Sequence, residues 1–379
     1  MKFPKKIKLA IVVGSTSLLG SGAMAQISTE MLNPFNNLEN PYVSDAEWST
    51  LPDGKTWGST AGVDIDPDGV HLWAIDRCGS NSCVGSDRPS VLKIDPEGNV
   101  VKAIGGGLFL FPHGLHVDKD GNVWVTDAQG PNGDDSRRNG MGHVVIKLSP
   151  EGEVLLTLGT PGVAGDGTGS DLNTPCDVVT NDNGDIFVGD GHNGQGQDGN
   201  GGGQGPDTVA RIVKFDKNGN LIKSWGKWGS GRGELMTPHA LDLDSKGRLV
   251  VGDRGNNRLQ IFDQEGNYLE ETTRFGRPSG IYITDDDTIY VADSESQSNN
   301  FKRHPGWRYG IRVGKLSDGE PSYFIRGIVG AYPDGSNPEG VAVDAAGNVY
   351  GAVVTQGKFP GQRGGMIKSR IPSKGNPGE

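Results

Sequence analysis

A hairpin with an Asp-x-x-Gly turn recurs along this 379-residue chain and restricts its fold more than any other feature. The clearest copy is VDKDGNVWV at 117–125, in which two short apolar strands flank a turn with glycine at its left-handed position. Further strands follow most copies, as in VIKLSPEG at 145–152, so each unit predicts four short antiparallel strands. The other hairpins lie at 66–76, 182–190, 244–253, 285–293 and 344–352.

Six copies of a four-stranded unit predict an all-β fold, a six-bladed β-propeller in which each blade packs against its neighbours around an axis. We divide the chain into a leader at 1–25, an N-terminal segment at 26–45, the propeller at 46–372 and a C-terminal tail at 373–379. The sixth copy has no fourth strand of its own. We expect residues 46–58 to supply it and so to close the ring.

The first 25 residues have the pattern of a secretory signal peptide, with a lysine-rich head, an apolar stretch at 9–19 and small residues ending at Ala25. No later segment approaches the roughly 20 apolar residues of a membrane helix. We therefore expect cleavage near Ala25, a periplasmic or secreted protein, and no membrane partner. In an oxidising compartment Cys78 and Cys83 can close a small disulfide loop, which leaves Cys176 as a small buried hydrophobe.

Composition narrows the choice of partner. Glycine makes up 62 of the 379 residues, against a usual share of about 7%, and its regular spacing indicates tight turns rather than disorder. The formal net charge is −11 and no basic stripe is present, so a nucleic-acid partner is not expected. We expect a monomer that acts on a small anionic or peptide-derived substrate.

Five of the six units begin with proline, and the next residue should start the innermost strand at the central channel. That residue is followed by a mostly small one but itself varies: Ala61, His113, Cys176, His239, Ser279 and Glu339. His113, His239 and Glu339 fall on alternate blades around the axis. Two imidazoles and a carboxylate with an open fourth position suit a catalytic Zn²⁺ or another divalent metal. The alternative is a wet channel in which each of these side chains binds water.

Residues just after the second strands should rim the same opening, because the second strand returns the chain to the channel mouth. These residues are Arg77, Ala128, Gly191, His192, Arg254 and Ser294. Two arginines beside a metal suit an anionic substrate, since a guanidinium binds a carboxylate through two parallel hydrogen bonds. The alternative for Arg77 and Arg254 is an ordinary ion pair with the preceding aspartate or its neighbours.

Two other rim features are expected to be structural or mobile. The strand-terminal aspartates recur with the framework and should satisfy backbone groups of turns. They are Asp76, Asp127, Asp190, Asp253 and Asp293. The loops at 130–142 and 191–208 exceed the repeat and should overhang the mouth as lids or walls.

The extended pattern around the hairpin, from Pro-His-Gly to Asp-x-x-Gly-Asn-x-aromatic-Val-x-Asp, resembles the NHL repeat. Within that group the chain is similar to the peptidyl-α-hydroxyglycine α-amidating lyase family over about residues 57–350, most specifically in the middle four blades. The stretches that carry the likeness are VLKIDPEGNVV (91–101), LFPHGLHVDKDGNVWVTD (110–127), DIFVGDG (185–191), RIVKFDKNGNLIKSWG (211–226) and TPHALDLDSKGRLVVGDRGNNRLQIFD (237–263).

The resemblance implies NHL-type blades and a catalytic zinc held by three histidines on alternate blades. It also implies cleavage of an α-hydroxyglycine-extended peptide into a peptide amide and glyoxylate. Two of the family's zinc histidines fall on His113 and His239, whereas the third falls on Glu339, which is a departure. The family's carboxylate-binding arginine matches Arg77, and a second active-site arginine matches Arg254.

Two further positions depart from the family. Its catalytic tyrosine is replaced by His192, and an aspartate that helps to hold a structural Ca²⁺ is replaced by Gly340, which leaves that calcium in doubt. Glutamate is a competent zinc ligand. Metal binding at the axis therefore survives these changes better than the amidating-lyase reaction itself.

The leading hypothesis is a metal-dependent lyase that cleaves the C–N bond of a carbinolamide-type anionic substrate, with His192 as general base. The main alternative is a non-catalytic NHL propeller that binds a peptide, a glycan or a protein. The substituted site beside the glycine-rich loop favours that alternative. A third reading, a hydrolase of lactones or esters, is the weakest, because lactonase-like propellers use more carboxylate and asparagine ligands than this chain offers.

Overall fold

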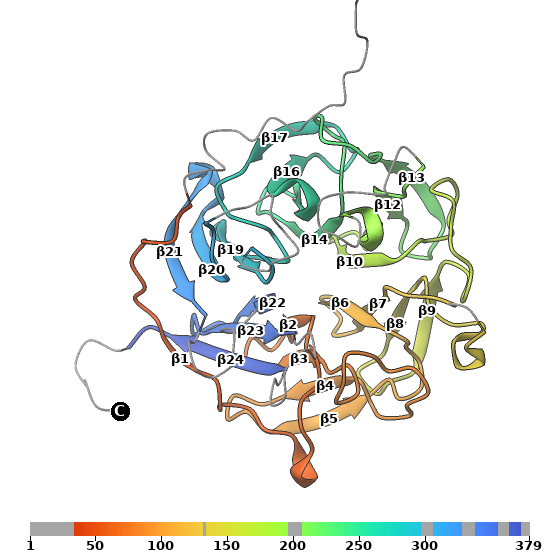
Figure 1. The fold of residues 1–379 in the computed structure, drawn as a ribbon, viewed down its shortest axis with the longest axis horizontal. Coiled ribbons are helices and arrows are strands. Elements are labelled where there is room, and N and C mark those ends of the chain that lie inside the picture. Colours follow the sequence, from red (N-terminus) through yellow and green to blue (C-terminus); the bar gives the residue numbers. More distant parts are fainter. Residues whose placement is uncertain are drawn as a thin grey trace, which may run out of the picture.

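The computed structural model describes residues 34–131, 134–195, 207–296, 306–327, 338–354 and 364–372. Within these ranges, 24 strands form six four-stranded antiparallel sheets, arranged as blades around a central axis (Figure 1). The predicted all-β six-bladed propeller is confirmed. Only short 3-10 turns accompany the strands in the described part of the chain.

The strands of each blade run in chain order from the channel outward, except in blade six, where the outermost strand comes from the N-terminal end. Blades one and two comprise β2 (Val63–Ile65), β3 (Leu72–Ile75), β4 (Val91–Ile94) and β5 (Val100–Ile104), then β6 (Pro112–Val117), β7 (Val123–Asp127), β8 (Val144–Leu148) and β9 (Val154–Leu158). Blades three and four comprise β10 (Pro175–Thr180), β11 (Ile186–Asp190), β12 (Arg211–Phe215) and β13 (Leu221–Trp225), then β14 (Pro238–Leu243), β15 (Leu249–Asp253), β16 (Arg258–Phe262) and β17 (Tyr268–Thr272). Blades five and six comprise β18 (Gly280–Ile283), β19 (Thr288–Asp293), β20 (Gly310–Lys315) and β21 (Glu320–Arg326), then β22 (Pro338–Val343), β23 (Val349–Val353), β24 (Gly365–Arg370) and β1 (Val43–Asp45). The 3-10 turns are η1 (Pro52–Gly54), η2 (Ser136–Arg138), η3 (His192–Gln195), η4 (Arg254–Asn256) and η5 (Leu316–Asp318).

The strand that closes the ring differs from the predicted one. β1 pairs antiparallel with β24, with Val43 opposite Arg370 and Ser44 opposite Ser369. The closing strand thus lies at 43–45, within the segment placed before the propeller, and not at 46–58. Pro52 opens the 3-10 turn η1 inside the segment 46–58, and this turn interrupts an extended strand. The leader at 1–25 and the tail at 373–379 lie outside the described residues.

The Asp-x-x-Gly turn is closed by the aspartate that begins it. In the copy at 118–121 the Gly121 N–H donates to the Asp118 carbonyl over 2.8 Å, and Gly121 has φ +80°. The Asp118 carboxylate then accepts from the Asn122 backbone over 2.9 Å and from Trp124 Nε1 over 3.0 Å. One side chain therefore fixes both the turn and an aromatic residue of the returning strand.

The hydrophobic core lies between blades rather than within them. One cluster joins Trp73 of blade one to Val125 of blade two, and the next joins Trp124 of blade two to Val188 of blade three. The innermost strands also contact each other in sequence around the ring, from β2 to β22 and back to β2. Each blade thus depends on both neighbours for burial, as in other repeat folds.

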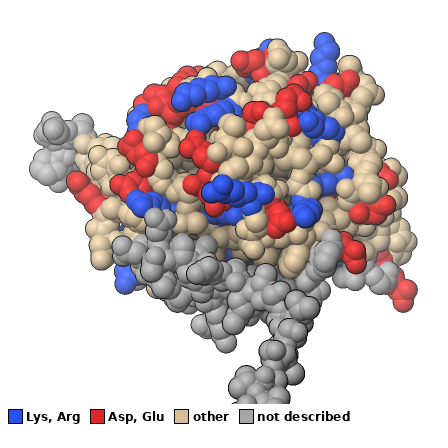
Figure 2. Space-filling model, turned by 90° about the horizontal axis from the view of Figure 1, so that it is seen from above, with Lys and Arg blue, Asp and Glu red and all other residues tan. Residues whose placement is uncertain are grey.

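Two features of the described residues bear on the expected partners, the distribution of surface charge and the length of the helices. On the face shown in Figure 2, basic and acidic side chains are interspersed rather than separated into patches. No helix in the described ranges is long and apolar enough to cross a membrane. The expectations of no nucleic-acid partner and of a monomer stay predictions.

Close approach of the inner strands predicts the effect of adding one methyl group. A Cβ at Gly114 would lie 2.5 Å from the Cys176 carbonyl oxygen, so Gly114→Ala should lower the free energy of unfolding by about 1–3 kcal/mol. Gly351→Ala is the matched control, because a Cβ there would meet only Ile311 and Pro338, each at 3.5 Å. Urea unfolding of both variants measures the difference, and equal midpoints would show that the strands are not in close contact.

Candidate functional site

The central channel is a cavity of about 270 Å³ enclosed by the six innermost strands. Its lining includes all six residues predicted to face the axis: Ala61, His113, Cys176, His239, Ser279 and Glu339. The varying position of the repeat therefore lies where the sequence placed it. Cys176 is fully buried and unpaired, as expected, and burial raises the pKa of its thiol well above the usual value.

A break in strand pairing aims the variable residue at the axis. The register between the first and second strands shifts directly after Pro112, Pro238 and Pro338. The residue after each of these prolines is therefore left out of the pairing, as in a β-bulge, which reorients a side chain. His113, His239 and Glu339 share this break with Cys176, whereas Ala61 and Ser279 line the same channel without a shift in register.

Both predicted histidine ligands are held in one tautomer by the next blade. His113 Nδ1 lies 2.9 Å from the Cys176 carbonyl oxygen, and His239 Nδ1 lies 2.6 Å from the Ser279 carbonyl oxygen. A carbonyl oxygen only accepts hydrogen bonds, so Nδ1 carries the proton in both rings. The two Nε2 atoms then present lone pairs to the channel, and both are buried without a hydrogen-bond partner.

Glu339 faces those two lone pairs. Its Oε1 lies 3.1 Å from His113 Nε2 and 3.7 Å from His239 Nε2. Burial alone raises the pKa of Glu339, but a hydrogen bond and positive charge from His113 and the charges of Arg254 and Arg77 outweigh it and bring the pKa to about 2. An ionised carboxylate oxygen thus lies close to two imidazole nitrogens, an arrangement that is stable when a cation, either a proton or a metal ion, lies between them.

The spacing of these atoms fits a divalent metal. Zinc–ligand bonds of about 2.0–2.1 Å in a tetrahedron separate the ligand atoms by roughly 3.3–3.4 Å. The two measured separations lie on either side of that value. The Nδ1–H to carbonyl hydrogen bonds are also the outer contacts that metal-binding histidines usually make. The residues present therefore fit the metal that the sequence predicted, whereas Gly340 offers no side chain to a calcium ion.

His192, predicted as a general base, lies in the same cluster. The ligand atoms of His113, His192 and His239 all lie within 4.8 Å of one another, so the three imidazoles form a candidate metal group. The His192 ring centroid lies 4.6 Å from that of His113 and 5.3 Å from that of His239. Its Nε2 accepts a hydrogen bond from Arg254 Nη2 over 3.5 Å. His192 is thus placed either to ligate a metal or to act on what the metal binds.

Arg77 is a buried cation at the rim, only 3% exposed. Its Nε donates to the Pro112 carbonyl over 3.0 Å and its Nη1 to Asn81 over 2.8 Å, while Nη2 is buried without a partner. The guanidinium lies 3.6 Å over the Phe111 ring. Burial lowers the pKa of Arg77 to about 10, although the charges of Glu339 and Asp127 oppose that shift. The alternative, an ion pair between Arg77 and the preceding Asp76, is not observed, because Asp76 pairs with Arg88.

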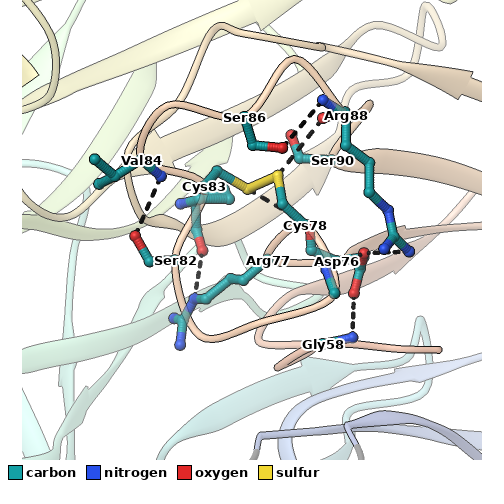
Figure 3. The surroundings of a disulfide bond; sticks show 12 residues. Gly58, Asp76, Arg77, Cys78, Ser82, Cys83, Val84, Ser86, Arg88 and Ser90 are labelled. Carbon is teal, nitrogen blue, oxygen red and sulfur yellow. Dashed lines mark hydrogen bonds and ion pairs between the residues drawn. A yellow bond between two sulfur atoms is a disulfide. The ribbon is translucent and has the colours of Figure 1, made fainter. Parts of the chain in front are cut away.

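The loop beside Arg77 is closed by the predicted disulfide. Cys78 and Cys83 are bonded, directly after Arg77 in the chain, and Figure 3 shows the loop with Arg77 and the Asp76–Arg88 pair next to it. The loop is further tied by the Cys83 N–H, which donates to the Leu110 carbonyl over 2.9 Å. This loop therefore fixes Arg77 between blades one and two.

Arg254 is likewise buried at the rim, with 2% of its surface exposed. It begins η4, and its Nε has no hydrogen-bond partner although it lies 3.6 Å from Glu295 Oε2. The preceding Asp253 pairs instead with Arg258 and accepts from the Met236 N–H. An ion pair with the aspartate beside it is thus excluded, whereas Glu295 is an acidic neighbour that the sequence did not indicate.

Two rim predictions remain, those for the strand-terminal aspartates and for the two long loops. The strand-terminal aspartates accept from backbone N–H groups as predicted, for example Asp127 from Leu110 and Phe111, and Asp190 from Asn173. Parts of the two long loops, 132–133 and 196–206, lie outside the described residues. Sequence reasoning missed Glu295 and Arg277, whose only signal was their position, directly after Ser294 of the rim and two residues before Ser279 of the channel.

Comparison with known proteins agrees with this geometry. The NHL repeat matches residues 235–262 and 275–298, within blades four and five. The chain is a six-bladed propeller with NHL repeats in blades four and five. A gluconolactonase from Xanthomonas campestris has the same fold, with a TM-score of 0.52 over 84% of this chain and 88% of that one, at 14% identity. That likeness concerns the fold alone.

Two curated relatives each match about two thirds of this chain. A probable peptidyl-α-hydroxyglycine α-amidating lyase of Caenorhabditis elegans is 29% identical over 61% of this chain and 61% of its own. NHL repeat-containing protein 3 of Mus musculus is 27% identical over 67% of this chain and 64% of its own. The chain spans less than two thirds of the length of the curated relatives it matches first.

The buried imidazoles predict how metal affinity depends on pH. Burial, followed by nearby positive charge, lowers the pKa of His239 and His192 well below 6.5, and burial lowers the pKa of His113. Neutral imidazole is the form that binds metal, so Co²⁺ affinity should change less than threefold between pH 7.5 and 6.0. The Co²⁺ affinity of a hexahistidine peptide, titrated in parallel, should fall over that range, because free imidazoles gain protons there. A loss of more than tenfold in the protein would contradict the prediction.

Removal of the disulfide should lower the stability of the protein. Replacing both Cys78 and Cys83 by serine should lower the free energy of unfolding by about 2 kcal/mol, the size expected for a six-residue loop. Urea unfolding checks this value. Reductant should shift the wild-type curve toward that of the double variant and leave the double variant unchanged, and identical curves in all cases would show that the bridge contributes nothing.

Proposed function

We propose that this NHL propeller is a metal-dependent lyase that cleaves the C–N bond of an α-hydroxyglycine-type or other carbinolamide substrate bearing a carboxylate. One observation carries the proposal. Two buried Nε2 lone pairs, fixed by their Nδ1 hydrogen bonds, converge on the ionised Glu339. The likeness to relatives named as amidating lyases supports the choice of reaction.

His113, His239 and Glu339 would hold the metal, for which zinc is the first choice. A divalent ion bound there supplies a Lewis acid that lowers the pKa of a substrate hydroxyl. All three side chains are at least nine-tenths buried, which keeps water from competing at the site. The Nδ1 hydrogen bonds hold both rings in the ligating tautomer without any rearrangement.

The two arginines would bind the substrate carboxylate. Arg77 Nη2 and Arg254 Nε are both buried donors without a hydrogen-bond partner. Of the two cations, Arg77 forms no ion pair in the described part of the chain, and Glu339 and Asp127 act on its charge only from a greater distance, so an incoming carboxylate could pair with it directly. A carboxylate bound by these two groups would lie at the same channel mouth as the proposed metal ligands, which would orient the rest of the substrate toward them.

His192 would act as the base. Burial and the charges of His113, Arg254 and Arg77 lower the pKa of its imidazole well below 6.5, so the ring is neutral and able to accept a proton near pH 7. It takes the proton of the substrate hydroxyl, the C–O bond becomes a carbonyl, and the C–N bond breaks. The proton then passes to the departing amide nitrogen, which leaves an amide, glyoxylate and a neutral His192.

The cellular location is inferred from two other features, the disulfide and the N-terminal leader. The formed Cys78–Cys83 bond agrees with an oxidising compartment, as does the signal-peptide pattern of the first 25 residues. We therefore propose a periplasmic or secreted enzyme. The competing role, a non-catalytic NHL propeller that binds a peptide, a glycan or a protein, keeps its basis in the two substituted family positions, His192 and Glu339.

The first experiment measures metal content by mass spectrometry and glyoxylate release from a peptidyl-α-hydroxyglycine, in wild type and variants. We expect about one zinc per chain and turnover in wild type, and neither in a His113→Ala/His239→Ala double variant. His192→Ala should keep the metal and lose about 10²–10⁴-fold in kcat. His192→Ala without metal would make His192 a ligand instead of the base, and a metal-free wild type without turnover would favour the binding propeller.

A further inference from the structure

Blade five supplies none of the candidate ligands, yet its residues contact functional groups on both sides. Its first strand is preceded by Arg277 and Ser279, and its second strand is followed by Ser294 and Glu295. These four residues form two pairs across the same corner of the blade. Ser279 and Ser294 lie together at the channel, and Arg277 and Glu295 lie together at the rim.

The serine pair touches the groups proposed to bind the metal. Ser294 Oγ donates to Glu339 Oε2 over 3.5 Å, so Oε1 remains directed at the two histidines. Because the carboxylate only accepts, the Ser279 hydroxyl must donate to Ser294 Oγ, 2.9 Å away. The Ser294 N–H in turn donates to Ser279 Oγ over 3.4 Å.

The same serine pair also reaches the neighbouring blade four. The carbonyl oxygen of Ser279 accepts the His239 Nδ1–H over 2.6 Å. Ser279 and Ser294 are only 4% and 2% exposed, so water does not replace either hydroxyl. Ser279 therefore contacts His239 of blade four directly through its backbone carbonyl. Its hydroxyl contacts Ser294, which in turn contacts Glu339 of blade six.

The charged pair touches the proposed anion site. Arg277 Nε donates to Glu295 Oε2 over 2.9 Å, and Arg277 Nη1 donates to the Arg254 carbonyl over 2.7 Å. Glu295 Oε2 lies 3.6 Å from Arg254 Nε. Arg277 therefore holds the backbone of Arg254 and also the carboxylate beside its guanidinium.

We infer that blade five is a positioning element, in which Ser279 and Ser294 orient the metal ligands Glu339 and His239 while Arg277 and Glu295 orient Arg254. The inference rests on the proposed function. Residues of this kind act through a ligand and not on the substrate, and their loss typically weakens metal binding by 10–100-fold. The two pairs should act independently, because one faces the metal ligands and the other faces the anion site.

Co²⁺ titration followed by visible absorption tests the serine pair. Ser294→Ala should weaken Co²⁺ binding by about tenfold, and Ser294→Thr, which keeps the hydroxyl, should restore it. In a Glu339→Gln background the Ser294→Ala change should have less than a threefold further effect. A Ser294→Ala protein that is folded by circular dichroism and binds Co²⁺ like wild type would overturn the inference.

Glyoxylate binding to the Co²⁺ protein tests the charged pair. Arg277→Lys keeps the positive charge but cannot donate to both Glu295 and the Arg254 carbonyl, so it should leave Co²⁺ affinity within twofold of wild type and weaken glyoxylate binding several-fold, with no further loss in an Arg254→Met background. Equal loss of Co²⁺ and glyoxylate affinity in Arg277→Lys would overturn the separation of the two pairs. A wild type that binds no Co²⁺ would overturn the proposed function, whereas a binding-competent wild type with insensitive variants would overturn this inference alone.

Discussion

The close approach of neighbouring inner strands around the channel is the constraint on which the site depends. The carbonyl oxygens of Cys176 and Ser279 lie within 3 Å of histidine nitrogens on the preceding blade. That distance requires a small residue next to the ligand, since a side chain at Gly114 would meet the Cys176 carbonyl. The blade packing that forms the core thus also selects the tautomer of each ligand. Fold stability and metal chemistry share one set of contacts.

The channel mouth contains two groups of side chains that differ in charge, the proposed metal ligands and the two arginines. The proposed metal ligands contribute one carboxylate, Glu339, beside two imidazoles, while Arg77 and Arg254 add two buried positive charges next to it. Burying a cation without a partner is costly, and side-chain stacking on Phe111 offsets only part of that cost for Arg77. Glu295 lies 3.6 Å from Arg254 Nε, whereas Arg77 forms no ion pair in the described part of the chain, so Arg77 offers the positive charge that an anion beside the proposed metal site would meet.

The sequence was sufficient for the blade count and for the channel residues, because both follow from a regular repeat. It also placed Arg77, His192 and Arg254 at the rim, since strand direction determines which ends meet. The closing strand at 43–45 was missed because three residues carry too little pattern to show a pairing with Arg370. The contacts of Ser294 and Glu295 were missed for another reason. A serine or a glutamate after a strand is a common residue at a common place, and only its distance to Glu339 or Arg254 makes it distinctive.

The pairing of β1 with β24 has a consequence for how the molecule is made. Val43 leaves the ribosome more than three hundred residues before its partner Arg370, so β1 has no partner strand and blade six cannot form until synthesis is nearly finished. Contacts of such long sequence separation form late, since the intervening chain must first be ordered. Glu339, a proposed metal ligand, lies on the first strand of that blade. A chain cut short near its end would therefore lose ring closure and the support of Glu339 together, which ties completion of the chain to assembly of the candidate site.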